Sequence, residues 1–140
     1  MKAELLERLS LLLDSLLAGA ILSIGACKGF EIGAGFISAL LKGSRNNDLH
    51  NEDGKFITNN SGGVLGGIST GQDIYFKAAF KPTPTIQGKR KVLNKNGGIE
   101  EIEINGRHDI CVAPRAVPVV EAMTALVIAD LLLLSRSSKV

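Results

Sequence analysis

Apolar residues recur at three- and four-residue spacing along the start of the chain, from Lys2 to about Ser23. Residues at this spacing share one face of an α-helix, so the pattern predicts an amphipathic helix there. Gly25 interrupts the pattern, and the short mixed run from Cys27 to Ile32 predicts a strand. The apolar run from Phe36 to Leu41 fits either a helix or a strand by length, and we expect a short helix.

Alternating apolar and polar residues indicate strands further along. Ile74 to Phe80 alternates in this way, which predicts a half-buried strand. Lys89 to Leu93 and Ile99 to Ile104 flank the turn sequence Asn94 to Gly98, which predicts a β-hairpin. The basic triplet that opens this hairpin faces a strand rich in glutamate and has no aromatic platform beside it. We therefore expect cross-strand charge pairs and no nucleic-acid partner.

The last apolar segment begins near Pro118, a residue that suits the first turn of a helix. This helix is apolar around most of its circumference. It must therefore be buried on several sides, either between the sheets of a sandwich or in an oligomer interface. Glu121 and Asp130 keep its uncharged runs well below about 18 residues, so no membrane span is predicted. Together the segments indicate an α+β fold with an antiparallel hairpin and two long helices.

Composition narrows the class of protein. The chain has 140 residues, of which 45% are apolar, and a formal net charge of +2. This is the size of one domain with a real core, and it excludes a disordered tail or a fibre. The charges are spread along the chain, which leaves an anionic small molecule open as a ligand and does not indicate a nucleic acid or a membrane surface.

The two cysteines, Cys27 and Cys111, lie far apart and lack CxxC spacing. This arrangement favours buried thiols in a reducing compartment and predicts neither a disulfide framework nor a metal site. The leucine-rich start resembles an export signal superficially. Charged residues interrupt its apolar run, so no signal is predicted. These residues are Glu4, Glu7, Arg8 and Asp14.

Two loops are candidates for ligand binding. A long polar stretch from Lys42 to Asn60 leads into a glycine-rich segment at 59–71, whose two Gly-Gly pairs allow backbone to approach a ligand closely or simply form tight turns. It matches no dinucleotide-binding, P-loop or nucleophile-elbow pattern. The second loop, Lys81 to Thr85, presents a lysine and two threonines on a backbone stiffened by two prolines. That set suits a phosphate, although an ordinary proline-rich turn has the same sequence signature.

The third candidate is Gly106-Arg107-His108-Asp109, which lies between an alternating segment and the C-terminal helix. Three ionisable side chains at a strand-to-helix junction are typical of a site, because a rigid scaffold holds them while a ligand can still reach them. The free N–H groups at a helix start also favour anions.

Three motifs in this order resemble the C-terminal part of the chorismate synthase family. They are TNNSGGVLGGISTG at 58–71, AFKPTPTI at 79–86 and GRHDICVAPRAVPVVEAMTALVIADLLL at 106–133. LDSLLAGAILSIGACKGFEIGAGF and GSRNND extend the resemblance back to Leu13. The family's N-terminal half has no counterpart here, so we expect the chain alone to have an incomplete active site.

The resemblance implies an architecture and an activity. Residues 1–140 would form one domain, half of a β-α-β sandwich with antiparallel strands and long buried helices. The activity would be that of a phosphate lyase of the shikimate pathway, which makes chorismate from 5-enolpyruvylshikimate 3-phosphate by a trans-1,4 elimination. The resemblance further implies reduced FMN as the cofactor, an association with NADP, a cytoplasmic location and a homotetramer. A noncatalytic flavin- or phosphate-binding fragment, or an oligomerisation fragment, is the alternative.

The resemblance also implies roles for particular residues. Asp109 would handle a proton beside the flavin, and His108 would orient Asp109 or react itself. The family usually has proline where this chain has Ile110, so the constraint on the Asp109 backbone differs. The cofactor-binding residues would be Gly25, Ala26, Gly66, Lys81, Pro82, Thr83, Pro84, Thr85 and Arg107.

Overall fold

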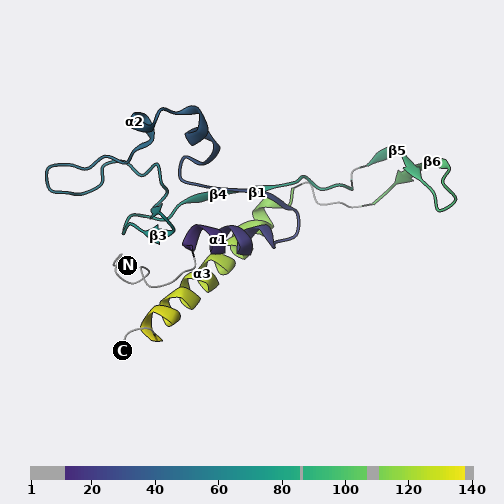
Figure 1. Ribbon diagram of the computed structural model, residues 1–140. Coiled ribbons are helices and arrows are strands. Elements are labelled where there is room, and N and C mark those ends of the chain that lie inside the picture. The colour runs from purple at the N-terminus through teal and green to yellow at the C-terminus, as the bar shows by residue number, and fades with distance from the viewer. Residues whose placement is uncertain (1–11, 86, 107–110, 138–140) are drawn as a thin grey trace.

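The computed structural model describes residues 12–85, 87–106 and 111–137. It contains three α-helices, a 3₁₀ helix and six strands in these ranges (Figure 1). The predicted α+β class, with antiparallel strands and long helices, is confirmed. The elements in chain order are α1 (Leu13–Leu22), β1 (Cys27–Ile32), η2 (Gly35–Leu40), α2 (Gly43–Asn46), β2 (Val64–Leu65), β3 (Ile68–Ser69), β4 (Phe76–Phe80), β5 (Gly88–Leu93), β6 (Ile99–Ile104) and α3 (Ala113–Ser137).

The central sheet is an antiparallel pair, β1 with β4, which joins segments far apart in the sequence. The register runs from Ile32 opposite Phe76 to Cys27 opposite Phe80. A bulge between Cys27 and Gly29 leaves Lys28 as an extra residue on β1. Both predicted strands are therefore confirmed, the second with a later start than Ile74.

Side chains reinforce this pairing on both faces. Lys77 Nζ lies 2.7 Å from Glu31 Oε1 across the strands. On the other face the Phe30 and Phe76 rings lie with their centroids 5.1 Å apart. Cross-strand pairs of these kinds contribute a few tenths of a kcal/mol to about 1 kcal/mol each. They fix the register more than they supply bulk stability.

The core lies where α1 meets α3 and the sheet (Figure 1). Its fully or nearly buried members are Leu13 and Leu17 of α1, Val64 of β2 and Leu131 of α3. The three-residue and four-residue spacing along α1 directs Leu13, Leu17 and Ile21 inward, as the sequence predicts. Burial of each leucine contributes about 1.5–3 kcal/mol to the stability of the fold. α1 therefore holds the sheet and α3 together.

α3 begins earlier than predicted, at Ala113, and Pro118 lies inside it. The Ala116 amide donates to the Val112 carbonyl at 3.0 Å, so the first turn is already formed before the proline. A proline at the sixth helical position leaves one carbonyl of the first turn without its usual N–H donor. The expectation that Pro118 opens the helix is therefore wrong by about one turn.

The burial of α3 differs from the expectation. Within the described residues only Leu131 and Ser135 of this helix are buried, while Leu126 is 63% and Leu133 is 64% exposed. Its most apolar 18-residue window has a mean hydropathy of 2.1, so by length and composition alone the helix could cross a membrane. A core helix of a soluble protein meets the same criterion. The absence of a membrane span stays a prediction.

The remaining predictions have mixed outcomes. The hairpin is confirmed as β5 and β6, and Lys89 Nζ lies 3.6 Å from Glu101 Oε1 across it. The segment after β1 is a 3₁₀ helix, so the helical alternative holds there. The stretch from Lys42 to Asn60 contains one helical turn, α2, and is not loop throughout. Of the two thiols, Cys27 is buried as expected and Cys111 is exposed.

A substitution at Gly33 tests how closely the backbone packs at the end of β1. Gly33 has φ +57°, and a Cβ there would collide with the Asn60 carbonyl and the Gly62 amide. We expect Gly33→Ala to lower the free energy of unfolding by about 3 kcal/mol or more, because backbone atoms cannot rotate away.

Gly54→Ala is the matched control for this substitution. Gly54 has φ +75° and open space around the position of a Cβ. Its cost is the left-handed backbone alone, about 1–2 kcal/mol. Urea unfolding followed by circular dichroism measures both, and equal losses would show that packing at Gly33 does not matter.

Candidate functional site

The end of β4 and the start of β1 bring two of the predicted cofactor-binding segments together. The Lys81 amide donates a hydrogen bond of 2.9 Å to the Ala26 carbonyl. Ala26 has φ +70°, the only positive value among the described residues other than glycine. Gly25 before it is exposed, with open space where a side chain would lie. The backbone at this junction is thus fixed and also accessible.

The loop from Lys81 to Thr85 continues from this junction. Lys81 is exposed and makes no ion pair with any described residue. The hydroxyl oxygen of Thr83 is buried and has no hydrogen-bond partner in the described part of the chain. An unsatisfied buried hydroxyl costs about 1–3 kcal/mol, so this loop gains stability from a ligand that offers a partner.

Arg90 of β5 holds the same loop from the other side. Its Nη1 atom donates a hydrogen bond of 2.5 Å to the Pro84 carbonyl. Sequence reasoning assigned the basic triplet to cross-strand pairing alone and missed this contact. The spacing of six residues gives no periodic signal for it.

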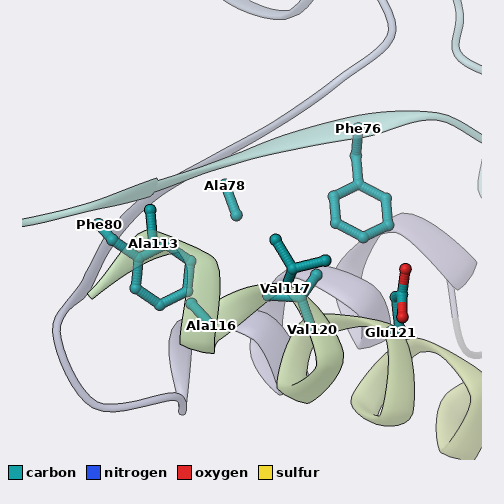
Figure 2. A pocket seen from close by; sticks show the side chains of 8 residues that line it. All are labelled: Phe76, Ala78, Phe80, Ala113, Ala116, Val117, Val120 and Glu121. Atoms are coloured by element: carbon teal, nitrogen blue, oxygen red, sulfur yellow. The ribbon is translucent and has the colours of Figure 1, made fainter. Parts of the chain in front are cut away.

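An open pocket lies between β4 and the first turns of α3, next to this loop (Figure 2). Its volume is about 240 Å³. Phe76 and Phe80 cover it from the strand, and the small side chains of α3 form its floor, with Glu121 as the one charged group. Phe80 directly precedes Lys81, so the apolar pocket and the polar loop adjoin. The pocket is lined by Phe76, Ala78, Phe80, Ala113, Ala116, Val117, Val120 and Glu121.

Gly66 lies elsewhere in the fold. With Gly67 it forms the two-residue turn between β2 and β3, and φ values of +58° and +81° are those of a type I′ hairpin turn. Gly67 is buried, and its carbonyl accepts a hydrogen bond of 2.9 Å from the Leu13 amide, whereas Gly66 is exposed. This turn therefore adjoins the start of α1, while Ala26 follows its end (Figure 1). About 15 Å of helix separates them, so Gly66 is not brought to the Lys81 loop.

A carboxylate that sequence reasoning did not single out organises the glycine-rich segment. Asp48 Oδ1 accepts hydrogen bonds from the Asn60 amide at 2.5 Å and the Thr58 hydroxyl at 3.0 Å. Its Oδ2 accepts from the Ser61 amide at 3.0 Å. Burial acts to raise the pKa of Asp48, but the hydrogen bonds from Ser61, Asn60 and Thr58 outweigh it and hold that pKa below its ordinary value. No local pattern reveals partners 10 to 13 residues away.

The three charged residues of the GRHD motif, Arg107, His108 and Asp109, lie outside the described residues. Their neighbours on the C-terminal side are described. Cys111 is exposed, and Ala113 at the start of α3 lines the pocket. No group of three or more metal-ligating side chains occurs in the part of the chain that the structure describes.

The residues present fit a flavin mononucleotide, which combines a flat apolar ring system with a phosphate. The Lys81 ammonium and the unpartnered Thr83 hydroxyl are donors suited to a phosphate. The neighbouring pocket is walled by aromatic and small apolar side chains suited to a flat ring. Gly66 adds an open backbone position, although at a distance from the other two features.

Comparison with known proteins decides the family. The family profile described as chorismate synthase matches residues 4–133. The chain belongs to the chorismate synthase family. The chorismate synthases of Christiangramia forsetii and Porphyromonas gingivalis are 54% and 55% identical to it, over 89% and 91% of this chain. A crystal structure of chorismate synthase superposes with a TM-score of 0.66 at 36% identity, over 87% of this chain.

The chain spans about a third of the length of these chorismate synthases. It covers 35% of the Christiangramia protein, 36% of the Porphyromonas protein and 30% of the chain in the crystal structure. The family profile and the two relatives establish the family and confirm the predicted family membership. The crystal structure supports the α+β fold.

Acid should loosen the hydrogen bonds around Asp48 in a defined direction. Because the folded-state pKa lies below the ordinary value of 3.8, these bonds stabilise the fold above pH 3.8, and that stability is lost as the pH falls through the lowered pKa. We expect the amide proton shifts of Asn60 and Ser61 to titrate together below pH 3.8.

NMR of the labelled chain measures these shifts. The Lys81 amide, which donates to the Ala26 carbonyl at 2.9 Å, should stay constant as the control. Asp48→Asn should abolish the titration of both amides. A common midpoint above pH 3.8 would contradict the assignment.

Proposed function

We propose that this chain forms part of the active site of a chorismate synthase, a lyase that eliminates phosphate from 5-enolpyruvylshikimate 3-phosphate to give chorismate. In this elimination the allylic C–O bond to phosphate breaks, a proton leaves, and a new C=C bond forms. Family membership supports the reaction class. The observation that carries the proposal is the hydrogen bond from Lys81 to Ala26, because it joins two segments that the family resemblance assigns to the cofactor.

The chain's own residues would bind and orient reduced FMN. The ammonium of Lys81 and the hydroxyl of Thr83 would hold its phosphate, with Thr85 as a further donor. Pro82 and Pro84 restrict the backbone of this loop, so less conformational freedom is lost on binding. The backbone of Gly25 and Ala26 would approach the cofactor from the start of β1.

Reduced FMN, when bound, supplies electron density that assists departure of the allylic phosphate without net redox change. Asp109 would accept a proton next to it, with His108 setting the orientation of that carboxylate. Arg107 would bind the anionic substrate or the cofactor. With about two thirds of the relatives' length unmatched, we propose that turnover needs residues beyond this chain.

The exposed apolar side of α3 favours a second role, in assembly. Leu126 and Leu133 are each more than 60% exposed, and a surface of this kind is typical of interfaces. A homo-oligomer, a tetramer by family resemblance, would cover it. A noncatalytic fragment that only assembles is the competing function, and tight FMN binding would count against it.

A substitution at Lys81 tests the proposed phosphate site. We expect Lys81→Ala to weaken FMN binding by roughly 10- to 100-fold, because a charge-assisted hydrogen bond contributes about 1.5–3 kcal/mol. Binding of riboflavin, which lacks the phosphate, should not change. Quenching of flavin fluorescence measures both affinities.

Lys95→Ala is the matched control, since Lys95 is an exposed lysine in the turn between β5 and β6. An equal loss of FMN and riboflavin affinity in Lys81→Ala would contradict a phosphate contact. An equal loss in the two lysine variants would indicate only a general effect of charge.

Turnover tests the reaction itself. In an anaerobic assay with reduced FMN and 5-enolpyruvylshikimate 3-phosphate, we expect no activity from this chain alone. We expect activity once the segment that precedes this region in the relatives is supplied. In the active form Asp109→Asn should keep FMN binding and lose most turnover, because the amide cannot accept the proton.

Two results would contradict these expectations. Turnover by the chain alone would refute the need for further residues. If the supplemented protein folds and binds FMN but makes no chorismate, the proposed reaction is wrong for this chain.

A further inference from the structure

Asp48 lies where the long polar loop returns to the glycine-rich segment. Its two carboxylate oxygens accept hydrogen bonds from Thr58, Asn60 and Ser61, which close the loop at its base. The Thr58 hydroxyl also accepts from the Leu49 amide at 2.7 Å, so the loop is joined on both sides of the carboxylate. Asp48 is thus the anchor from which the following backbone starts.

We propose that Asp48 is a positioning residue for the cofactor: by holding the amides of Asn60 and Ser61, it fixes the place of the turn formed by the exposed Gly66 and the buried Gly67. The inference rests on the proposed function and on the family resemblance, which assigns the backbone of Gly66 to FMN. Asp48 itself touches neither cofactor nor substrate in this account. It acts through the segment that it anchors.

The backbone after Ser61 has almost no room to adjust. A Cβ on Gly62 would meet the Gly33 backbone, and one on Gly63 would meet the backbone of Asp73. The Asn59 side chain ties the same turn together, since its Oδ1 accepts from Gly63 N at 2.6 Å and its Nδ2 donates to Asp73 O at 2.9 Å. This close fit forms only when the two residues before Gly62 are held in place.

The hairpin that carries the turn cannot fix itself. β2 and β3 have two residues each, and a hairpin so short is not stable alone. Its base is set by Gly63, whose carbonyl accepts from the Thr70 amide at 2.9 Å. Its far end touches α1 through the bond from Leu13 to Gly67. The position of Gly66 therefore depends both on this bond and on where the segment enters at Asn60 and Ser61.

This position requires an ionised carboxylate, whose oxygens only accept hydrogen bonds. Three donors converge on Asp48 and none of its oxygens has to donate, so an ionised acid satisfies all of them. Asparagine keeps the shape but turns one N–H₂ group toward an N–H or O–H donor, which loses at least one hydrogen bond. Glutamate keeps both acceptors on a stem that is one methylene longer.

Hydrogen exchange and FMN titration of the full chain test the inference. We expect Asp48→Asn to raise amide exchange at Asn60 and Ser61 and also at Gly67, and to weaken FMN binding about tenfold. Exchange in β1 and β4 should not change. Asp48→Glu should recover part of both effects, which a general loss of stability would not allow.

Asp53→Asn is the matched control, because Asp53 lies in the same loop and its side chain makes no hydrogen bond to the described residues. Wild-type exchange and FMN affinity in this variant are expected. Equal effects in both variants would overturn the inference, since they would reflect lost charge alone.

The exchange and binding measurements test different claims, and different outcomes contradict each. Faster exchange confined to Asn60 and Ser61, with Gly67 unchanged, overturns the positioning role even if FMN binding is intact. Wild-type protein that does not bind FMN overturns the proposed function instead, and the exchange at Gly67 still decides whether Asp48 fixes the turn.

Discussion

The antiparallel pairing of β1 with β4 is the constraint on which the candidate site depends. It brings together residues about fifty positions apart, and each of its two ends has a separate consequence. At one end Lys81 meets Ala26, which seats the proline-stiffened loop beside an exposed backbone. At the other end the Gly33 amide donates to the Tyr75 carbonyl at 3.1 Å, next to the glycine-rich segment at 59–71. The ladder therefore contributes to the placement of both loops.

Helix α1 connects the turn at Gly66 and Gly67 to the start of β1. Its first amide bonds to Gly67, and its last turn leads through Gly25 to β1. Buried leucines on its inner face pack against α3, so the three parts of the chain share one small core. Most of α3 lies outside that core, and large apolar side chains such as Leu126 and Leu133 are exposed on it.

Sequence patterns predicted elements more successfully than contacts. Alternation identified β4, β5 and β6, and the helical spacing of leucines identified the buried face of α1, because these signals depend only on local geometry. The predicted start of α3 at Pro118 was wrong, because a helix tolerates a proline just beyond its first turn when the preceding residues already form that turn. The family motifs located the Lys81 loop, and the strand pairing was needed to place it against Ala26. Asp48 and Arg90 were missed because their hydrogen-bond partners lie 6 to 13 residues away, where no local periodic pattern indicates them.

The bulge gives β1 one residue more than its pairing with β4 requires. Lys28 is the extra residue between Cys27 and Gly29, and beyond it each position of β1 faces its partner on β4 in simple order. Cys27 and Gly29 already face consecutive residues of β4, so the loss of Lys28 would leave a regular ladder with every partner kept. The loss of a residue between Gly29 and Ile32 would instead turn the side chains on one side of the gap to the opposite face. Lys28 is exposed, and its side chain can be exchanged freely. The pairing therefore tolerates deletion as well as substitution at position 28, whereas the paired positions from Gly29 to Ile32 tolerate substitution and not deletion.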